Sequence, residues 1–134
     1  MDKDSEGAEL VRAKRLRRRY LVFRVESKNG DKIWKRREIE EPLINSLLVL
    51  RGIVGLVETN FKLVKYDEQR SAGIISCFHK HVDLVRSAIL MAGYRLDNTV
   101  MYTVKTTGTL KKAIKILESM PKIISHNFVD TRKE

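Results

Sequence analysis

The first strand signal in the chain is Tyr20–Ser27, which reads Y-L-V-F-R-V-E-S. Apolar Leu21, Phe23 and Val25 alternate with Val22, Arg24 and Glu26, and this period of two predicts a β-strand with one face in the core. Tyr20 and Phe23 then point to opposite faces of a sheet. A strand this apolar needs neighbouring strands and a covering layer, which the segments around it must supply.

The residues that follow the strand predict a turn and then a helix. Asn29-Gly30 is a strong hairpin turn signal, and we expect residues 31–37 to return as a second, irregular leg. Pro42 suits the first turn of a helix, where its missing N–H costs nothing. The apolar residues of 43–50 have helical spacing, and Gly52 is expected to end or loosen that helix.

The rest of the chain alternates strands and helices. The expected elements are a strand at Glu58–Asp67, a strand at Gly73–Phe78, a helix at His81–Ala92 stopped by Gly93, a strand at Thr99–Thr106 and an amphipathic helix at Leu110–Met120 ended by Pro121. This order predicts an α+β fold: a ferredoxin-like (RRM-like) βαββαβ sandwich with two helices on one face and an extra C-terminal helix. We expect an acidic tip and basic extension over 1–19, the domain over 20–120 and a charged tail over 121–134.

The charge of the chain is unevenly distributed. The chain has 134 residues and a formal net charge of +10, and residues 12–37 alone hold twelve bases against two acids. Such a concentration indicates a polyanionic partner and carries no information about the fold. The N-terminus has no apolar signal core and the apolar residues of 43–57 are interrupted by polar ones, so we expect neither a targeting segment nor a membrane span.

Two segments are candidate RNA-binding sites. The first is the run Arg12, Lys14, Arg15, Arg17, Arg18 and Arg19, which favours a helix by composition and whose guanidinium groups suit phosphates. The second comprises Gly108, Thr109, Lys111, Lys112 and Lys115, where a small-residue turn precedes a basic helix face. The alternatives are a solvated basic tail for the first segment and ordinary helix capping by a threonine for the second. Aromatic residues for base stacking are too few on the central strands, so we expect phosphate contacts and shape to dominate.

No set of residues forms a recognisable active site. Cys77, the single cysteine, lies in an apolar strand and is expected in the core. His79 and His81 have no carboxylate or third ligand at a telling spacing, so we expect them to fill a strand-to-helix junction. The sequence predicts no catalytic residue and no metal site. The apolar residues around Ile53 and Leu90 exceed what one core needs, which indicates a protein contact or additional burial by the last helix.

An ordered series of short motifs resembles a known family. The series is Arg19–Phe23, Gly52–Gly55, Phe61–Tyr66, Gly73–Cys77, Val85–Ile89 and Thr107–Lys112. Together these motifs resemble protein component 2 of archaeal ribonuclease P, a family shared with a small eukaryotic ribonuclease P/MRP subunit, from about Arg19 to about Leu117. Two positions depart from the family pattern, Thr107 in place of a serine and Ser76 in place of an arginine.

The resemblance implies a non-catalytic subunit of a ribonucleoprotein that removes the 5′ leader from precursor tRNA. It implies that the RNA is the catalyst, that magnesium is held by RNA with no cofactor on the protein, and that the protein supports the catalytic domain of the RNA. The implied partners are ribonuclease P RNA, precursor tRNA and ribonuclease P protein component 3, in a heterotetramer formed by self-association in the cytoplasm. The alternatives are another ferredoxin-like RNA-binding protein, a stand-alone ribonuclease using His79 and His81, or a sensor of a small anion.

Overall fold

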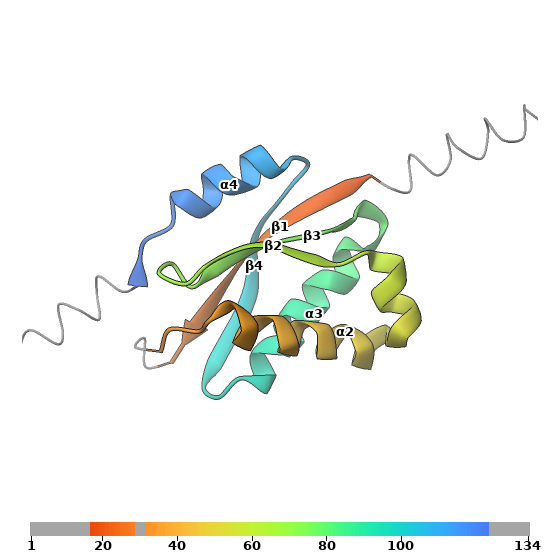
Figure 1. Cartoon of the computed structure of the whole chain (residues 1–134), viewed down its shortest axis with the longest axis horizontal. Helices are drawn as coiled ribbons and strands as arrows, with labels where there is room; N and C mark the ends of the chain where they lie inside the picture. Colours follow the sequence, from red (N-terminus) through yellow and green to blue (C-terminus); the bar gives the residue numbers. More distant parts are fainter. Residues whose placement is uncertain (1–16, 29–31, 124–134) are drawn as a thin grey trace, which may run out of the picture.

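A computed structural model describes residues 17–28 and 32–123 of the chain. Its elements are β1 (Arg18–Ser27), α2 (Arg36–Thr59), β2 (Lys62–Asp67), β3 (Ala72–Phe78), the short 3-10 helix η1 (His79–His81), α3 (Val82–Arg95), β4 (Thr99–Thr107) and α4 (Leu110–Glu118). The fold is α+β, with a four-stranded antiparallel sheet and three α-helices in the described residues (Figure 1). This architecture is consistent with the ferredoxin-like prediction.

The strand that opened the sequence analysis lies in the centre of the sheet. The strand order is β2-β3-β1-β4, and β1 pairs antiparallel with both β3 and β4. Leu21, Val22, Phe23 and Val25 are fully buried. Because side chains alternate between the two faces of β1, they contribute to two cores, one on each face of the sheet.

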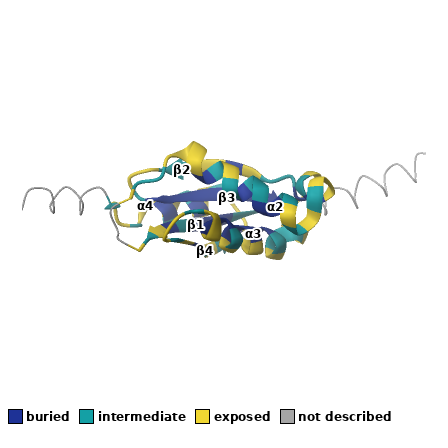
Figure 2. Ribbon diagram, turned by 90° about the horizontal axis from the view of Figure 1, so that it is seen from below, coloured by how far each residue is buried: buried dark blue, intermediate teal, exposed yellow. Residues whose placement is uncertain are grey.

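The helices divide between those two faces. Leu21, Phe23 and Val25 belong to the larger core, which includes buried residues of α2 and α3. Val22 on the other face packs with Ala113 and Leu117 of α4, and Tyr20 lies against the same cluster. Figure 1 shows α4 on the opposite side of the sheet from α2 and α3, and Figure 2 colours almost all of β3 as buried. The extra helix thus covers the sheet face that the prediction left open.

The first helix starts earlier than predicted. Instead of a returning strand leg after Asp31, residues 32–35 lead directly into α2, which begins at Arg36. The Lys35 backbone N–H donates to the Glu38 carboxylate at 3.0 Å, which caps this end and explains the start. The prediction of a strand leg was wrong, because residues 32–35 form no strand and the helix begins directly after them. The turn signal on which it rested, Asn29-Gly30, lies outside the described residues. Pro42 consequently lies within α2 and not in its first turn.

Gly52 interrupts α2 as the sequence predicted. Its φ of 69° and ψ of −168° are non-helical values that a residue with a side chain rarely adopts, so the helix changes direction there. By length and composition α2 is long enough and apolar enough to cross a membrane, a test that core helices also pass. The Gly52 break and the burial of Ile39, Leu43 and Leu47 indicate a core helix with a kink.

Several other boundaries differ from prediction because tertiary packing overrides local signals. The predicted strand at Glu58–Asp67 begins only at Lys62, since α2 continues through Thr59. Helix α3 continues past Gly93 to Arg95, where the sequence predicted a stop. A Cβ at Gly93 would lie 2.7 Å from the Met101 backbone nitrogen, so this glycine permits close packing of α3 on β4. The C-terminal helix ends at Glu118, before the predicted Met120.

Candidate nucleic-acid interface

The fold brings Arg19, from the first predicted basic segment, beside the start of the second. Strand β1 begins beside the end of β4, with Tyr20 paired to Thr107. The Arg19 guanidinium lies against the next residue, Gly108, because a Cβ built there would be 2.7 Å from Arg19 Nη1. We define the basic corner as Arg19, Gly108, Thr109, Lys111 and Lys112. Residues that lie 89 positions apart in the sequence are therefore neighbours at the start of α4.

The turn into α4 is held by its own threonines. The Thr107 hydroxyl donates to the Thr109 carbonyl at 2.8 Å, and the Lys112 backbone N–H donates to the Thr109 hydroxyl oxygen at 3.3 Å. Thr109 is thus the N-cap of α4. This is the capping role that the sequence analysis weighed as the alternative to anion binding. It fixes the position of the basic helix face.

The lysines of α4 project from the protein. Ala113 and Leu117 are buried against the sheet, whereas Lys111, Lys112 and Lys115 are exposed on the opposite face of the helix. This amphipathic arrangement follows from their spacing in the sequence. Their ammonium groups are therefore available to an external anion beside the Arg19 guanidinium.

Arg18 is used differently from its neighbours. Its guanidinium donates to the Ser76 hydroxyl, to Asn60 Oδ1 at 2.8 Å and to the Asn60 carbonyl at 2.7 Å. The same group lies 5.1 Å from the centre of the Phe78 ring. These internal partners give Arg18 a structural role that joins β1 to β3 and to the end of α2, and the RNA contact expected at this residue stays a prediction.

The predicted basic helix over Arg12–Arg19 is wrong where the structure describes it. Arg18 and Arg19 belong to β1, and Arg17 is exposed immediately before it. The Arg17 carbonyl accepts from the His79 backbone N–H at 2.7 Å, which extends the pairing of β1 with β3 by one residue. Arg12, Lys14 and Arg15 lie outside the described residues.

Asn60 is a site residue that the sequence analysis missed. Its left-handed conformation, with φ and ψ both 48°, ends α2, and its side chain accepts from Arg18. An asparagine between a helical pattern and a strand is a typical C-cap signal, so the position could have been recognised. Its hydrogen-bond partner could not, because Arg18 lies 42 residues earlier in the chain.

Cys77, His79 and His81, the remaining residues considered for catalysis, lie where the sequence predicted them. Cys77 is buried, and burial raises the pKa of its thiol to about 11, with a smaller opposing effect from the Arg18 charge. A thiol with this pKa stays protonated at neutral pH and is a poor nucleophile. His79 and His81 form η1 at the junction of β3 and α3. Within residues 17–28 and 32–123, no three His, Cys, Asp or Glu side chains group closely enough to hold a metal ion.

The second half of α2 exposes an apolar stripe. Val49, Ile53, Val54 and Val57 are each between 63% and 73% exposed. Val49 precedes the break at Gly52, whereas Ile53, Val54 and Val57 follow it at helical spacing. The prediction of apolar residues in excess of the core is confirmed for this helix, and α4 does not cover it because it lies on the other sheet face.

Comparison with known proteins matches these features to one family. A family model described as the Rpp14/Pop5 family matches residues 19–117, the range over which the sequence motifs resembled that family. Ribonuclease P protein component 2 of Pyrococcus furiosus is 30% identical over 97 residues, covering 72% of this chain and 78% of the relative. The protein of the same name from Saccharolobus solfataricus is 35% identical over 116 residues, covering 84% and 74%.

A solved structure shares the fold. A chain in the cryo-EM structure of yeast ribonuclease MRP superimposes with a TM-score of 0.57 at 14% sequence identity. The match covers 89% of this chain and 97% of that chain. At this identity the likeness concerns the fold alone.

Proposed function

The chain belongs to the Rpp14/Pop5 family, and from this membership we propose how it acts as a protein subunit of ribonuclease P. Ribonuclease P is the ribonucleoprotein that removes the 5′ leader from precursor tRNA, and this chain is one of its protein components. The proposal concerns which surfaces contact RNA, which contact protein, and where the catalytic groups reside.

The basic corner binds the RNA subunit of ribonuclease P and stabilises its catalytic domain. The observation that carries this proposal is the contact of Arg19 with Gly108 at the start of α4, which concentrates the cations of two distant segments. Exposed Lys111, Lys112 and Lys115 extend that positive surface along the helix. Arginine and lysine at this density neutralise phosphates and release counterions. Arg12, Lys14 and Arg15 add to the same charge, and precursor tRNA is a further RNA ligand of the complex.

The chain takes no chemical step in the cleavage reaction. The thiol of Cys77 is buried, and the His79–His81 segment has no partner carboxylate among the described hydrogen bonds and ion pairs. We place the catalytic groups and the magnesium ions on the RNA, where the protein acts by screening phosphate repulsion. The subunit works in the cytoplasm, where precursor tRNA of an archaeal cell is made.

The apolar stripe of α2 supports the proposed protein contacts. Ribonuclease P protein component 3 and a second copy of this chain are the proposed partners, in a heterotetramer. This helix exposes four aliphatic side chains, and burying them against a partner favours association.

Reconstitution tests the function and the basic corner together. Ribonuclease P RNA, this chain and protein component 3 are combined with precursor tRNA at low magnesium, and leader removal is measured with and without this chain. We expect omission to abolish most cleavage. The paired variant Arg19→Glu/Lys112→Glu should weaken binding to the RNA by roughly tenfold or more.

The matched control places the same charge change on the far edge of the sheet. Lys62→Glu/Lys65→Glu alters two exposed lysines of β2, which is separated from β4 by two strands. Cleavage that does not change when this chain is omitted would overturn the function. Equal effects of the two double variants would retain the function and overturn the role of the basic corner.

A further inference from the structure

The outer side of β4 carries a groove that the basic corner does not include. Strand β4 is an edge of the described sheet, because it pairs only with β1. Two hollows, of about 650 Å³ and about 290 Å³, lie along it and share Leu90 of α3 as a lining residue. We call these two hollows together the β4 groove.

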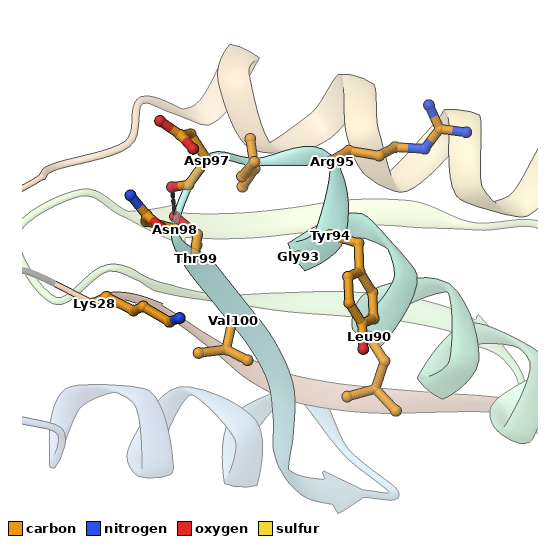
Figure 3. A pocket seen from close by; sticks show the side chains of 10 residues that line it. Lys28, Leu90, Gly93, Tyr94, Arg95, Asp97, Asn98, Thr99 and Val100 are labelled. Carbon is orange, nitrogen blue, oxygen red and sulfur yellow. Dashed lines mark hydrogen bonds between the residues drawn. The ribbon is translucent and has the colours of Figure 1, made fainter.

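One end of the β4 groove presents an aromatic ring. Tyr94, in the last turn of α3, is 91% exposed. Figure 3 shows its ring beside Leu90, with the Lys28 side chain reaching from the end of β1 toward Val100 on the other side. Among the described residues, no stacking or cation–π contact involves this ring. An aromatic face this exposed, with a lysine among the residues that line the same hollow, is suited to a planar base that carries a phosphate.

The charges that line the groove are predominantly positive. Lys28 lines the larger hollow, and Arg86 and Lys105 line the smaller one. Asp97 is the one acid lining either hollow within residues 17–28 and 32–123, and Figure 3 shows it at the top of the view, beyond Asn98. Arg86 also has a partner outside the groove, since its guanidinium lies 3.7 Å from the Asp83 carboxylate. The charge complements a polyanion along the whole strand.

The backbone of β4 is poorly suited to a peptide strand. The pairing of β1 with β4 shifts register between Val22 and Phe23, which leaves Val104 as an extra residue on the edge. Such a bulge interrupts the regular row of backbone donors and acceptors that an added strand needs. The shape therefore favours a ligand recognised by side chains.

We propose that the β4 groove binds a single-stranded RNA segment, with one base stacked on Tyr94 and the backbone phosphates along Lys28, Lys105 and Arg86. This proposal rests on the proposed function for the identity of the ligand as RNA. It adds a second contact, recognising unpaired nucleotides, to the phosphate contacts of the basic corner. The aromatic residue lies on α3 at the sheet edge, away from the central strands where the sequence analysis expected no stacking.

Substitutions at Tyr94 test the stacking. The ring is almost wholly exposed, so neither Tyr94→Ala nor Tyr94→Phe should alter the fold, which thermal unfolding verifies. The probes are a fluorescent oligouridylate of about 12 nucleotides and an RNA duplex of similar length, each titrated with the protein. Tyr94→Ala should bind the single strand roughly fivefold to a hundredfold more weakly, while Tyr94→Phe keeps the wild-type affinity. Duplex binding should not distinguish the three proteins.

Substitution of lysines on the two edge strands tests the phosphate contacts. Lys105→Gln on β4 and Lys65→Gln on β2 remove one exposed charge each, from opposite edges of the sheet. Lys105→Gln should reduce the slope of log affinity against log salt for the single strand by about 0.7. Lys65→Gln should leave that slope at the wild-type value.

Three outcomes overturn the proposal. The first is a Tyr94→Ala variant that binds the oligouridylate as tightly as the wild type, and the second is an equal loss of slope in both lysine variants. The third is a Tyr94→Ala variant that loses affinity for protein component 3 with its RNA affinity intact, which would make the groove a protein-docking site. In each case the proposed function stands as long as the wild-type chain still stimulates precursor tRNA cleavage. A wild-type chain that does not stimulate cleavage contradicts the proposed function instead.

Discussion

At the scale of single residues, adjacent arginines have different surroundings. Arg17 is exposed before β1, Arg18 is held by Ser76, Asn60 and Phe78, and Arg19 lies against Gly108. In a strand, neighbouring side chains point to opposite faces, so residues of one type meet different partners. A basic run is therefore not a uniform binding site, and each arginine has a separate expected phenotype.

Arg18→Gln should destabilise the protein, whereas Arg17→Gln should not. Loss of the Arg18 guanidinium leaves the partly buried Asn60 oxygens without a donor, which should lower the free energy of unfolding by about 1–3 kcal/mol. Arg17→Gln should change it by less than about 0.5 kcal/mol and should weaken RNA binding. Urea unfolding and RNA titration of both variants measure this. Equal destabilisation by the two substitutions would contradict the assignment of Arg18.

The buried thiol makes stability depend on alkaline pH. Burial raises the pKa of Cys77 from 9.0 to about 11, so between these values the unfolded chain has lost the thiol proton while the folded chain retains it. The free energy of unfolding should therefore fall as pH rises from about 9 to about 11, by up to about 3 kcal/mol. The contribution of the protonated Cys77 thiol to the free energy of unfolding is fully present below pH 9.

Cys77→Ala isolates the contribution of the thiol. Urea unfolding of the wild type and of this variant across that pH range should give curves that converge as pH rises. Burial also raises the pKa of Tyr66, from 10.0 to about 12, and this contribution remains in both proteins. Parallel curves would show that the Cys77 thiol does not titrate differently in the folded and unfolded states.

At the scale of elements, α4 is positioned by contacts at both of its ends. Thr109 caps its start, and the Arg70 guanidinium donates to the carbonyls of Met120 and Glu118 at its end. Arg70 is in turn paired with Asp67 at 2.6 Å in the turn between β2 and β3. These contacts orient the apolar face of α4 onto the sheet, which leaves its lysines facing outward.

The close packing of α3 on β4 predicts the effect of glycine substitutions. In the interior of a helix, alanine is favoured over glycine by about 1 kcal/mol. Gly93→Ala should nevertheless lower the free energy of unfolding by about 1–3 kcal/mol, because the new methyl group would overlap the Met101 backbone. Gly108→Ala is the control, since its methyl group meets only the movable end of Arg19. Thermal unfolding compares the two, and a Gly93→Ala protein as stable as the wild type would contradict the packing.

At the scale of the whole molecule, the positive charge is concentrated in one part of the sequence. The net charge is +10, and the excess lies in residues 12–37, which include the start of the central strand. A chain with this charge distribution favours a long polyanion over a single small anion. The distinction separates the RNA-binding function from the alternative of an anion sensor.

Salt dependence measures how many phosphates the whole molecule contacts. Each contact contributes about −0.7 for single strands to about −0.9 for duplexes to the slope of log affinity against log salt, so several contacts should give a slope of about −3 or steeper. Titration of ribonuclease P RNA at several salt concentrations gives this value. A slope near that of one contact, together with tight binding of a small anion, would favour the sensor.

The properties that depend on local periodicity and composition could be predicted from the sequence. The alternation in Tyr20–Ser27 identified the central strand, the order of strands and helices indicated the α+β class, and the uneven charge indicated a polyanionic partner. Boundaries such as the start of α2 and the end of α3 were less predictable, since capping and packing shift them by several residues.

Which distant residues contact one another could be seen only in the tertiary structure. The register of β1 between β3 and β4 places Arg19 at Gly108 and Arg18 at Asn60, and the packing of α4 selects the sheet face that it covers. The β4 groove exists for the same reason, because Lys28 follows β1, Tyr94 lies on α3 and Lys105 lies on β4. Periodicity is a property of residues that are close in the sequence, so it can be recognised locally. These contacts depend on strand register and helix packing, which involve residues from the whole chain.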